Sequence, residues 1–435
     1  MKLDRKKLFR IHGWIGIKLS ILFFIVCFSG TLAVLSHEMD WLFNPDTRAQ
    51  YQEQRASRNS IVQQVKASMP DARIVYWEAS REPYLCDQIH VTQDNHRYYV
   101  FANPYTGQVQ GHASLTIARF LRDLHYYLFI PFQVGHFTVL IFGFLLLASV
   151  ITALYFYRKW YRKFFALKKG KGPVVLFRSL HRVVGVWSIP LALLFAVTGI
   201  WYFIERTNLG QVSTIANTKT PEIQALGLDS VAFAQMDATL DYDQAIAAAK
   251  AAIPDLQVKD IFIPTQQDRP LYLTGTNTTP LVRHRANRVY IHPLTYEVVA
   301  VQDAGKINTV TWLNDIMDPL HFGYWGGLPS KIIWFLSGLA ISGLVLTGIW
   351  ISLKRKVRDA QKAKHQRLGK WKYANWAVLF LLLLFMYGTL IVRYAAGTGL
   401  IIGLTLAIIG LTVLGWYIFV HRIAKSLEKE RATKT

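Results

Sequence analysis

Cysteine is scarce in this chain of 435 residues, which contains only Cys27 and Cys86. Cys27 lies in an apolar run and Cys86 in a polar segment, so we do not expect them to pair. No CxxC or zinc-ligand spacing occurs, and the absence of CxxCH excludes covalent attachment of a c-type haem. No glycine-rich dinucleotide fingerprint follows a predicted strand, so there is no sign of an NAD or flavin domain.

Acidic residues are also few, since 27 Asp and Glu stand against 49 Lys and Arg and leave a net charge of +22. The basic residues gather beside apolar runs, at residues 2–10, 158–171, 354–372 and 422–434. This placement favours contact with anionic lipid over binding to nucleic acid. The positive-inside rule places all four clusters, and therefore both termini, in the cytoplasm.

Apolar residues, in contrast, make up 52% of the chain. Six stretches reach the length of about 20 apolar residues that a bilayer core requires. They are residues 14–36, 135–157, 182–204, 331–353, 373–393 and 400–421. The first is too long for the core of a signal peptide and is expected to remain as a membrane anchor. The polar segments 40–118 and 206–318 then lie outside the cytoplasm.

One histidine pattern occurs at the start of two of these stretches. The positions are His12, Gly16 and Gly30 in the first copy and His181, Gly185 and Gly199 in the second. On a continuous α-helix the three positions of each set point within roughly 40° of one direction. An imidazole and two positions without a side chain therefore lie on one face of the helix. Packing of helices through small residues is the better explanation of a single copy. Two copies in register favour a site for a flat ligand such as a porphyrin.

The two halves of the chain share one plan, which predicts an internal duplication. Each polar segment reads as a short helix ended near a proline, then strands with an Asn/His-Pro-x-Thr turn between them. The predicted fold class is therefore an α-helical membrane protein with two extracytoplasmic α+β modules and a C-terminal helical hairpin. The predicted boundaries are 1–38 (first span), 39–118 (first module), 119–160 (second span), 161–205 (loop and third span), 206–318 (second module), 319–358 (fourth span) and 359–435 (loop, hairpin and tail).

Two further histidines occupy matching places before the second span of each half, in Asp123-Leu-His125 and in Asp318-Pro-Leu-His321. Paired imidazoles on facing helices suit the two axial positions of a b-type haem, which then transfers electrons. The predicted metal ligands are His12 with His181 at the cytoplasmic ends and His125 with His321 at the outer ends. His136, eleven residues beyond His125, is an alternative outer ligand. Two haem b groups are expected.

These motifs make the chain similar to the PepSY-associated transmembrane proteins over about residues 5–358. The matching elements are the two histidine–glycine helix starts, the Leu-His elements at His125 and His321, Gly326-Gly-Leu-Pro-Ser-Lys331, Leu346-Thr-Gly-Ile-Trp350 and the turn Asn103-Pro-Tyr-Thr-Gly107. The polar segments resemble PepSY domains. The second departs from the usual turn, with Thr295-Tyr296 where Thr-Gly is expected, and the C-terminal hairpin exceeds a four-helix form.

The resemblance implies a ferric-siderophore reductase of a bacterial inner membrane, with the PepSY modules in the periplasm. The expected partners are the lipid bilayer, a ferric siderophore and an electron donor, either quinol or a cytoplasmic reductant. The alternative is a membrane-anchored PepSY module that binds a peptide, protease or envelope partner without redox chemistry. A transporter built on the repeat is disfavoured, because the repeats share one orientation and no span carries a pair of interior acids.

Overall fold

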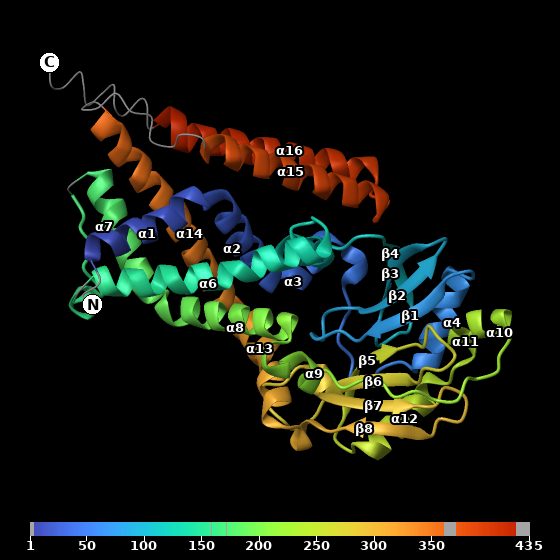
Figure 1. The fold of residues 1–435 in the computed structure, drawn as a ribbon. Coiled ribbons are helices and arrows are strands. Elements are labelled where there is room, and N and C mark those ends of the chain that lie inside the picture. The colour runs from blue at the N-terminus through green and yellow to red at the C-terminus, as the bar shows by residue number, and fades with distance from the viewer. Residues whose placement is uncertain (1–3, 158, 171, 361–370, 423–435) are drawn as a thin grey trace. The chain divides into compact units, whose positions relative to one another are not determined.

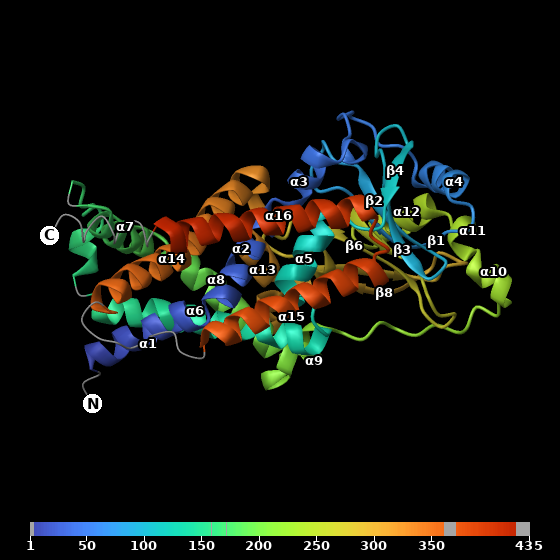
Figure 2. The same ribbon diagram turned by 90° about the horizontal axis from the view of Figure 1, so that it is seen from above.

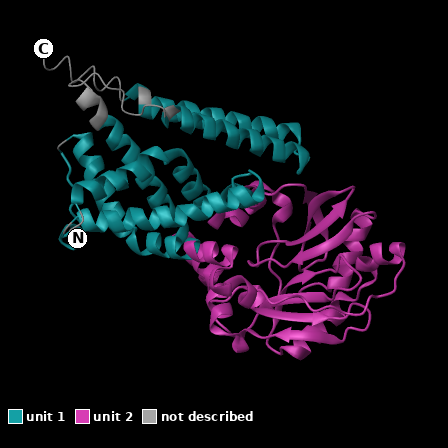
Figure 3. Ribbon diagram, in the orientation of Figure 1, with its two compact units in different colours: residues 1–32, 122–199, 334–435 teal, residues 33–121, 200–333 magenta. Residues whose placement is uncertain are grey.

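The computed structural model of the chain describes residues 4–157, 159–170, 172–360 and 371–422 (Figure 1). Parts of the four basic clusters, such as residues 361–370, lie outside these ranges. The chain divides into two compact units (Figure 3). Unit 1 combines residues 1–32, 122–199 and 334–435, and unit 2 combines residues 33–121 and 200–333.

Five helices of the described residues are long and apolar enough to cross a membrane. They are α6 (Phe132–Phe156), α8 (Ile189–Thr207), α14 (Gly327–Ala360), α15 (Trp371–Val392) and α16 (Thr398–Trp416). A sixth span is possible from α1 (Arg5–Lys18) and α2 (Ser20–Val34), which meet at a bend of 73°. The prediction of a multi-pass membrane protein is confirmed at this level.

Apolar side chains from distant stretches form the interior of unit 1. Ile15 of α1 and Phe23 of α2 pack with Phe142 of α6 and with Leu382 of α15. Glycines bring two helices close together, since a Cβ added to Gly199 of α8 would lie 3.5 Å from a backbone atom of α6. Helix α7 (Pro173–Trp187) precedes α8, with Ser188 between them. Because Leu382 is part of this interior, α15 belongs to the packed bundle of unit 1.

Unit 2 contains one antiparallel sheet of eight strands in the order β4-β3-β2-β1-β5-β6-β7-β8. The first polar segment supplies β1 (Arg73–Glu78), β2 (Asp87–Gln93), β3 (His96–Ala102) and β4 (Val109–Ala113). The second supplies β5 (Gln257–Phe262), β6 (Leu271–Thr276), β7 (Asn287–Ile291) and β8 (Val298–Gln302). Strands β1 and β5 pair with Trp77 opposite Ile261. The two polar segments thus share one sheet, a feature that their separate sequences do not indicate.

Helices cover one face of this sheet. The helices α4 (Arg58–Ser68), α11 (Met236–Thr239) and α12 (Tyr242–Ala252) lie along the sheet (Figure 2). They pack over a core that includes Trp77 and Ile261. Capping explains where two of them begin, because the side chains of Ser57 and Asp241 accept hydrogen bonds from backbone N–H groups of the first turns. Each short amphipathic helix expected from the sequence is therefore present.

The opposite face carries a row of rings that crosses six strands. Successive centroids lie 4.2–5.4 Å apart. The row consists of Tyr99, His90, Tyr76, Phe262, Tyr272 and Tyr290. Cross-strand aromatic pairs stabilise an antiparallel sheet, so the row strengthens the junction between β1 and β5.

The two proline-containing turns between strands differ at the position where the family pattern has glycine. Asn103 Oδ1 accepts hydrogen bonds from two backbone N–H groups of the first turn, and Gly107 adopts a left-handed φ of 77°. In the second turn Tyr296 takes the left-handed place with a φ of 60°. Its hydroxyl accepts a hydrogen bond of 2.6 Å from the backbone N–H of Asp241. This contact helps to offset the cost of left-handed backbone at a residue with a Cβ.

Candidate functional site

The predicted inner pair, His12 on α1 and His181 on α7, lies within unit 1. The helices around the two rings share one apolar cluster, which includes Ile15 of α1 and Val345 of α14. His12 Nδ1 lies 3.1 Å from the carbonyl oxygen of Ser149 on α6. His181 Nδ1 lies 2.9 Å from Oγ1 of Thr347 on α14. Each ring is therefore held by a helix other than its own.

These contacts determine the tautomer of both rings. A carbonyl oxygen only accepts, so a neutral His12 carries its proton on Nδ1. The hydroxyl of Thr347 donates to the carbonyl of Gly343 at 2.8 Å, which leaves its oxygen to accept from His181 Nδ1–H. The lone pair then lies on Nε2 in both rings, and neither Nε2 bonds to another described residue. An axial metal ligand with a hydrogen-bonded second nitrogen has this arrangement.

Several glycines lie on the helices that carry or hold this pair, and Gly348 of α14 lies against His181, since an added Cβ would be 3.4 Å from Cε1 of the ring. A Cβ added to Gly16 of α1 or to Gly343 of α14 would have no atom of the described residues within 4 Å. A Cβ on Gly185 would meet only the side chain of Leu344, at 3.9 Å. The donor chemistry of the inner pair therefore fits a cofactor that takes two nitrogen ligands from protein.

The face predicted to run from His12 to Gly30 does not exist as one surface. The bend of 73° between α1 and α2 turns Gly30 away from the direction of His12, whereas the spacing argument assumed a continuous helix. Gly30 instead lies against the imidazole of His125, whose Cε1 would be 2.6 Å from an added Cβ. That glycine makes room for the other predicted ligand rather than for the inner site.

His125 lies near the end of α5 (Ile117–Tyr127). Its Nδ1 is 3.0 Å from the carbonyl oxygen of Val26 and 3.4 Å from Ser29 Oγ, both on α2. The carbonyl requires a donor, so the proton of a neutral ring lies on Nδ1, as in the inner pair. Asp40 of α3 (Ser36–Phe43) holds the start of α5, since its carboxylate accepts from the N–H groups of Ile117 at 2.6 Å and Ala118 at 3.0 Å.

His136, the alternative outer ligand, lies just after the first turn of α6 and is 4% exposed. Its Nδ1 is 3.2 Å from the carbonyl oxygen of Tyr126, and its ring stacks on Phe132 at 5.3 Å. α5 ends at Tyr127 and α6 begins at Phe132, so His125 and His136 are on separate helices. Both rings have Nδ1 held by a carbonyl, and the choice between them stays open.

His321 belongs to unit 2, on α13 (Thr309–Phe322). Its ring contacts the edge of Tyr202 on α8, with centroids 5.4 Å apart. The Tyr202 hydroxyl donates a hydrogen bond of 2.7 Å to Asp318, one turn before His321. Asp318 also accepts from Arg283 Nη1 at 3.1 Å. The surroundings of His321 thus connect to a larger polar network.

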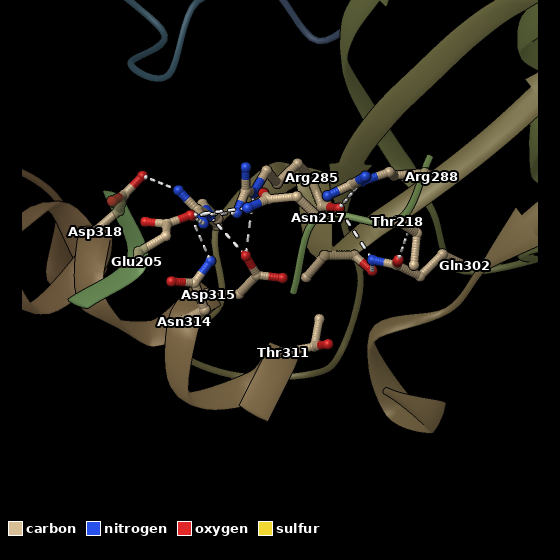
Figure 4. Close-up of polar contacts among 12 residues, drawn as sticks. Glu205, Asn217, Thr218, Arg285, Arg288, Gln302, Thr311, Asn314, Asp315 and Asp318 are labelled. Atoms are coloured by element: carbon tan, nitrogen blue, oxygen red, sulfur yellow. Dashed lines mark hydrogen bonds and ion pairs between the residues drawn. The ribbon is translucent and has the colours of Figure 1, made fainter. Parts of the chain in front are cut away.

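This network was not predicted from the sequence, because its charges come from three separated stretches (Figure 4). Arg283 and Arg285 donate to Asp315 Oδ1 of α13 at 2.6 and 3.2 Å. Glu205 of α8 accepts from Asn314 at 2.9 Å and from Arg285 at 3.5 Å. Burial works to lower the pKa of Arg283, but the neighbouring carboxylates raise it above its ordinary value. The network joins the sheet segment to the helices that carry Tyr202 and His321.

No group of three or more His, Cys, Asp or Glu residues in the described parts of the chain could hold a metal ion by itself. A haem iron takes four ligands from its porphyrin and needs only two from protein, so paired histidines remain sufficient. The profile of the family described as PepSY-associated TM region matches residues 9–355. No curated protein sequence matches this chain.

Proposed function

Because the chain belongs to the PepSY-associated transmembrane family, we propose that it is a di-haem b electron-transfer protein that reduces ferric siderophores. The membrane would be the bacterial inner membrane, with both termini in the cytoplasm and the sheet segment in the periplasm. The distribution of basic residues supports this orientation. Ferric siderophore is the substrate, and quinol or a cytoplasmic reductant is the electron donor.

The observation that carries the proposal is the inner pair of His12 and His181. Both Nδ1 atoms are held by oxygens of other helices, which directs Nε2 as the ligand atom. Haem bound by two histidines would supply reversible one-electron chemistry without an open axial position. The sequence pattern alone supports a second haem, with His125 or His136 and His321 as its ligands.

The internal duplication predicted from the sequence supports the second site. Two four-stranded meanders meet in the sheet through β1 and β5, as related halves would. Each half also has an aspartate shortly before its outer histidine, and each aspartate accepts a tyrosine hydroxyl. We therefore assign His125 and His321 equivalent roles in the two halves.

The reaction transfers one electron to each ferric ion. The donor gives up that electron, and Fe(III) becomes Fe(II). Siderophores hold Fe(II) far more weakly, because their hard oxygen donors suit the harder ion. Reduction in the periplasm would therefore release iron from the siderophore.

The visible spectrum of the purified full-length protein tests the proposal. Protein produced with haem available should show a Soret band that shifts when dithionite is added. A pyridine haemochrome assay should give two haems per chain. A colourless preparation would reject the redox function and favour the anchored binding module.

A further inference from the structure

The carboxylate of Asp123 joins two tyrosines from distant parts of the chain. Asp123 lies on α5, two residues before His125, and is 2% exposed. Its Oδ2 accepts hydrogen bonds from the hydroxyl of Tyr127, at 2.7 Å, and from the hydroxyl of Tyr394, which follows α15. Tyr394 is itself 5% exposed, so protein encloses the contact.

Arg393 completes this cluster. Its Nη1 donates a hydrogen bond of 3.2 Å to the Tyr127 oxygen, whose own proton goes to Asp123. The guanidinium also lies over the ring of Tyr394, 5.5 Å from its centroid. Tyr127 thus links the arginine to the carboxylate, and a buried acidic group obtains the hydrogen bonds that it requires.

Asp318 has the same kinds of partner in unit 2. It precedes His321 by three residues and accepts from the hydroxyl of Tyr202 and from Arg283. There the arginine comes from the sheet segment. At Asp123 the arginine and one tyrosine come from the C-terminal hairpin, which has no counterpart in the other half.

The helix that precedes Tyr394 is attached to the bundle at its other end as well. The side chain of Asn375 donates to the carbonyl of Lys18 at 3.2 Å, and the rings of Trp371 and Trp14 meet at 6.1 Å. Leu390, one turn before Tyr394, is fully buried. None of the apolar window of α16 is buried. The element that reaches Asp123 is therefore the anchored helix of the hairpin.

We infer that the C-terminal hairpin positions His125. Tyr394 holds Asp123 directly and Arg393 holds it through Tyr127. Asp123 then fixes the last turn of α5, where His125 meets Gly30 of α2. The role of His125 as a ligand rests on the proposed function. The hydrogen bond between Tyr394 and Asp123, called the clamp below, does not depend on the proposed function. The clamp and the ligand role of His125 can therefore be tested separately.

The test compares Tyr394→Phe with Tyr387→Phe in the detergent-solubilised full chain. Both changes remove one hydroxyl from the hairpin, but the Tyr387 hydroxyl pairs with Thr405 Oγ1 of α16, at 2.7 Å. Hydrogen–deuterium exchange of α5 should rise in Tyr394→Phe and stay unchanged in Tyr387→Phe. Transfer of haem to apomyoglobin should be on the order of tenfold faster in Tyr394→Phe, as expected for losing a hydrogen bond to a charged group. The haem that is transferred faster should be the one that is missing from His125→Ala.

Unchanged exchange of α5 in Tyr394→Phe, or an equal rise in both variants, would overturn the inference. A colourless wild type with faster exchange in Tyr394→Phe alone would reject the haem function and retain the clamp. If Tyr394→Phe does not fold, Arg393→Gln takes its place in the test, because Arg393 is exposed and its replacement does not disturb a buried side chain. It should raise exchange of the same helix to a smaller extent, and no rise would again overturn the inference.

Discussion

Gly30 of α2 and the imidazole of His125 on α5 are in such close contact that a Cβ on the glycine would lie 2.6 Å from the ring. Real side chains do not approach so closely, so the glycine is required for this packing. The contact places Nδ1 of the ring beside the carbonyl of Val26. A small residue on one helix therefore controls the orientation of a candidate ligand on another.

Gly30→Ala should displace His125 and destabilise unit 1 by about 1–3 kcal/mol, the usual cost of overpacking. Thermal unfolding of the solubilised protein measures the loss of stability, and the pyridine haemochrome assay should show loss of one haem. Gly388→Ala is the matched control, because no described atom lies within 4 Å of its added Cβ. Equal behaviour of the two variants would contradict the contact.

His12→Ala and His181→Ala should each lower haem content by about half, because both axial ligands are needed to hold one haem. The remaining haem should be the same in both variants, as shown by identical reduced spectra. His96→Ala in the sheet provides a control that should keep full haem content. If both ligand variants retain all of their haem, the assignment of the inner pair is wrong.

Asp40 should make stability depend on pH. Its burial raises the pKa from 3.8 to about 6, although the N–H groups of Ala118 and Ile117 oppose the shift. Between these two pH values, the carboxyl group of Asp40 is therefore protonated in the folded state but ionised in the unfolded chain. The stabilisation is greatest near pH 4 and is lost as the pH rises towards 6, by about 3 kcal/mol at most.

Unfolding temperatures measured between pH 4 and pH 7.5 check this dependence. Asp40→Asn cannot titrate and should remove that part of the pH dependence, while its amide oxygen can still accept from the start of α5. Identical pH profiles of the wild type and the variant would show that Asp40 does not contribute.

Arg283→Gln should destabilise unit 2 by about 3–5 kcal/mol, because the buried carboxylate of Asp315 and the half-buried carboxylate of Asp318 lose their main cation. Chemical unfolding followed by tryptophan fluorescence provides the measurement. Arg269→Gln removes an exposed ion pair with Glu222 and should cost less than about 1 kcal/mol. Similar losses in both variants would argue against a structural role for the network.

The membrane character and the family were predictable from local sequence. Apolar runs of sufficient length identify spans one at a time, and the predicted stretches correspond to the five candidate helices and the bent pair. The family motifs are likewise short, and the predicted family is confirmed by the match to residues 9–355. The haem ligands, the siderophore and the donor stay predictions.

The network around Arg283 could not be predicted in the same way. The sequence drew attention to Asp318, through its place before His321, but not to an arginine 35 residues away. Charges in polar segments are usually solvated, and only the approach of α13 to the sheet segment buries these. The same holds for Tyr394, whose partner Asp123 lies 271 residues earlier.

By itself the sequence determined which segments enter the membrane, which segments form strands and which histidines are available as ligands. These properties follow from composition and periodicity within a segment, because hydrophobic length and side-chain alternation are local. The tertiary structure alone decided the pairing of β1 with β5, the bend between α1 and α2, and the contacts of Gly30 with His125 and of Tyr394 with Asp123. A segment's pattern shows that one of its faces is buried, but the partner of that face depends on how all segments pack at once.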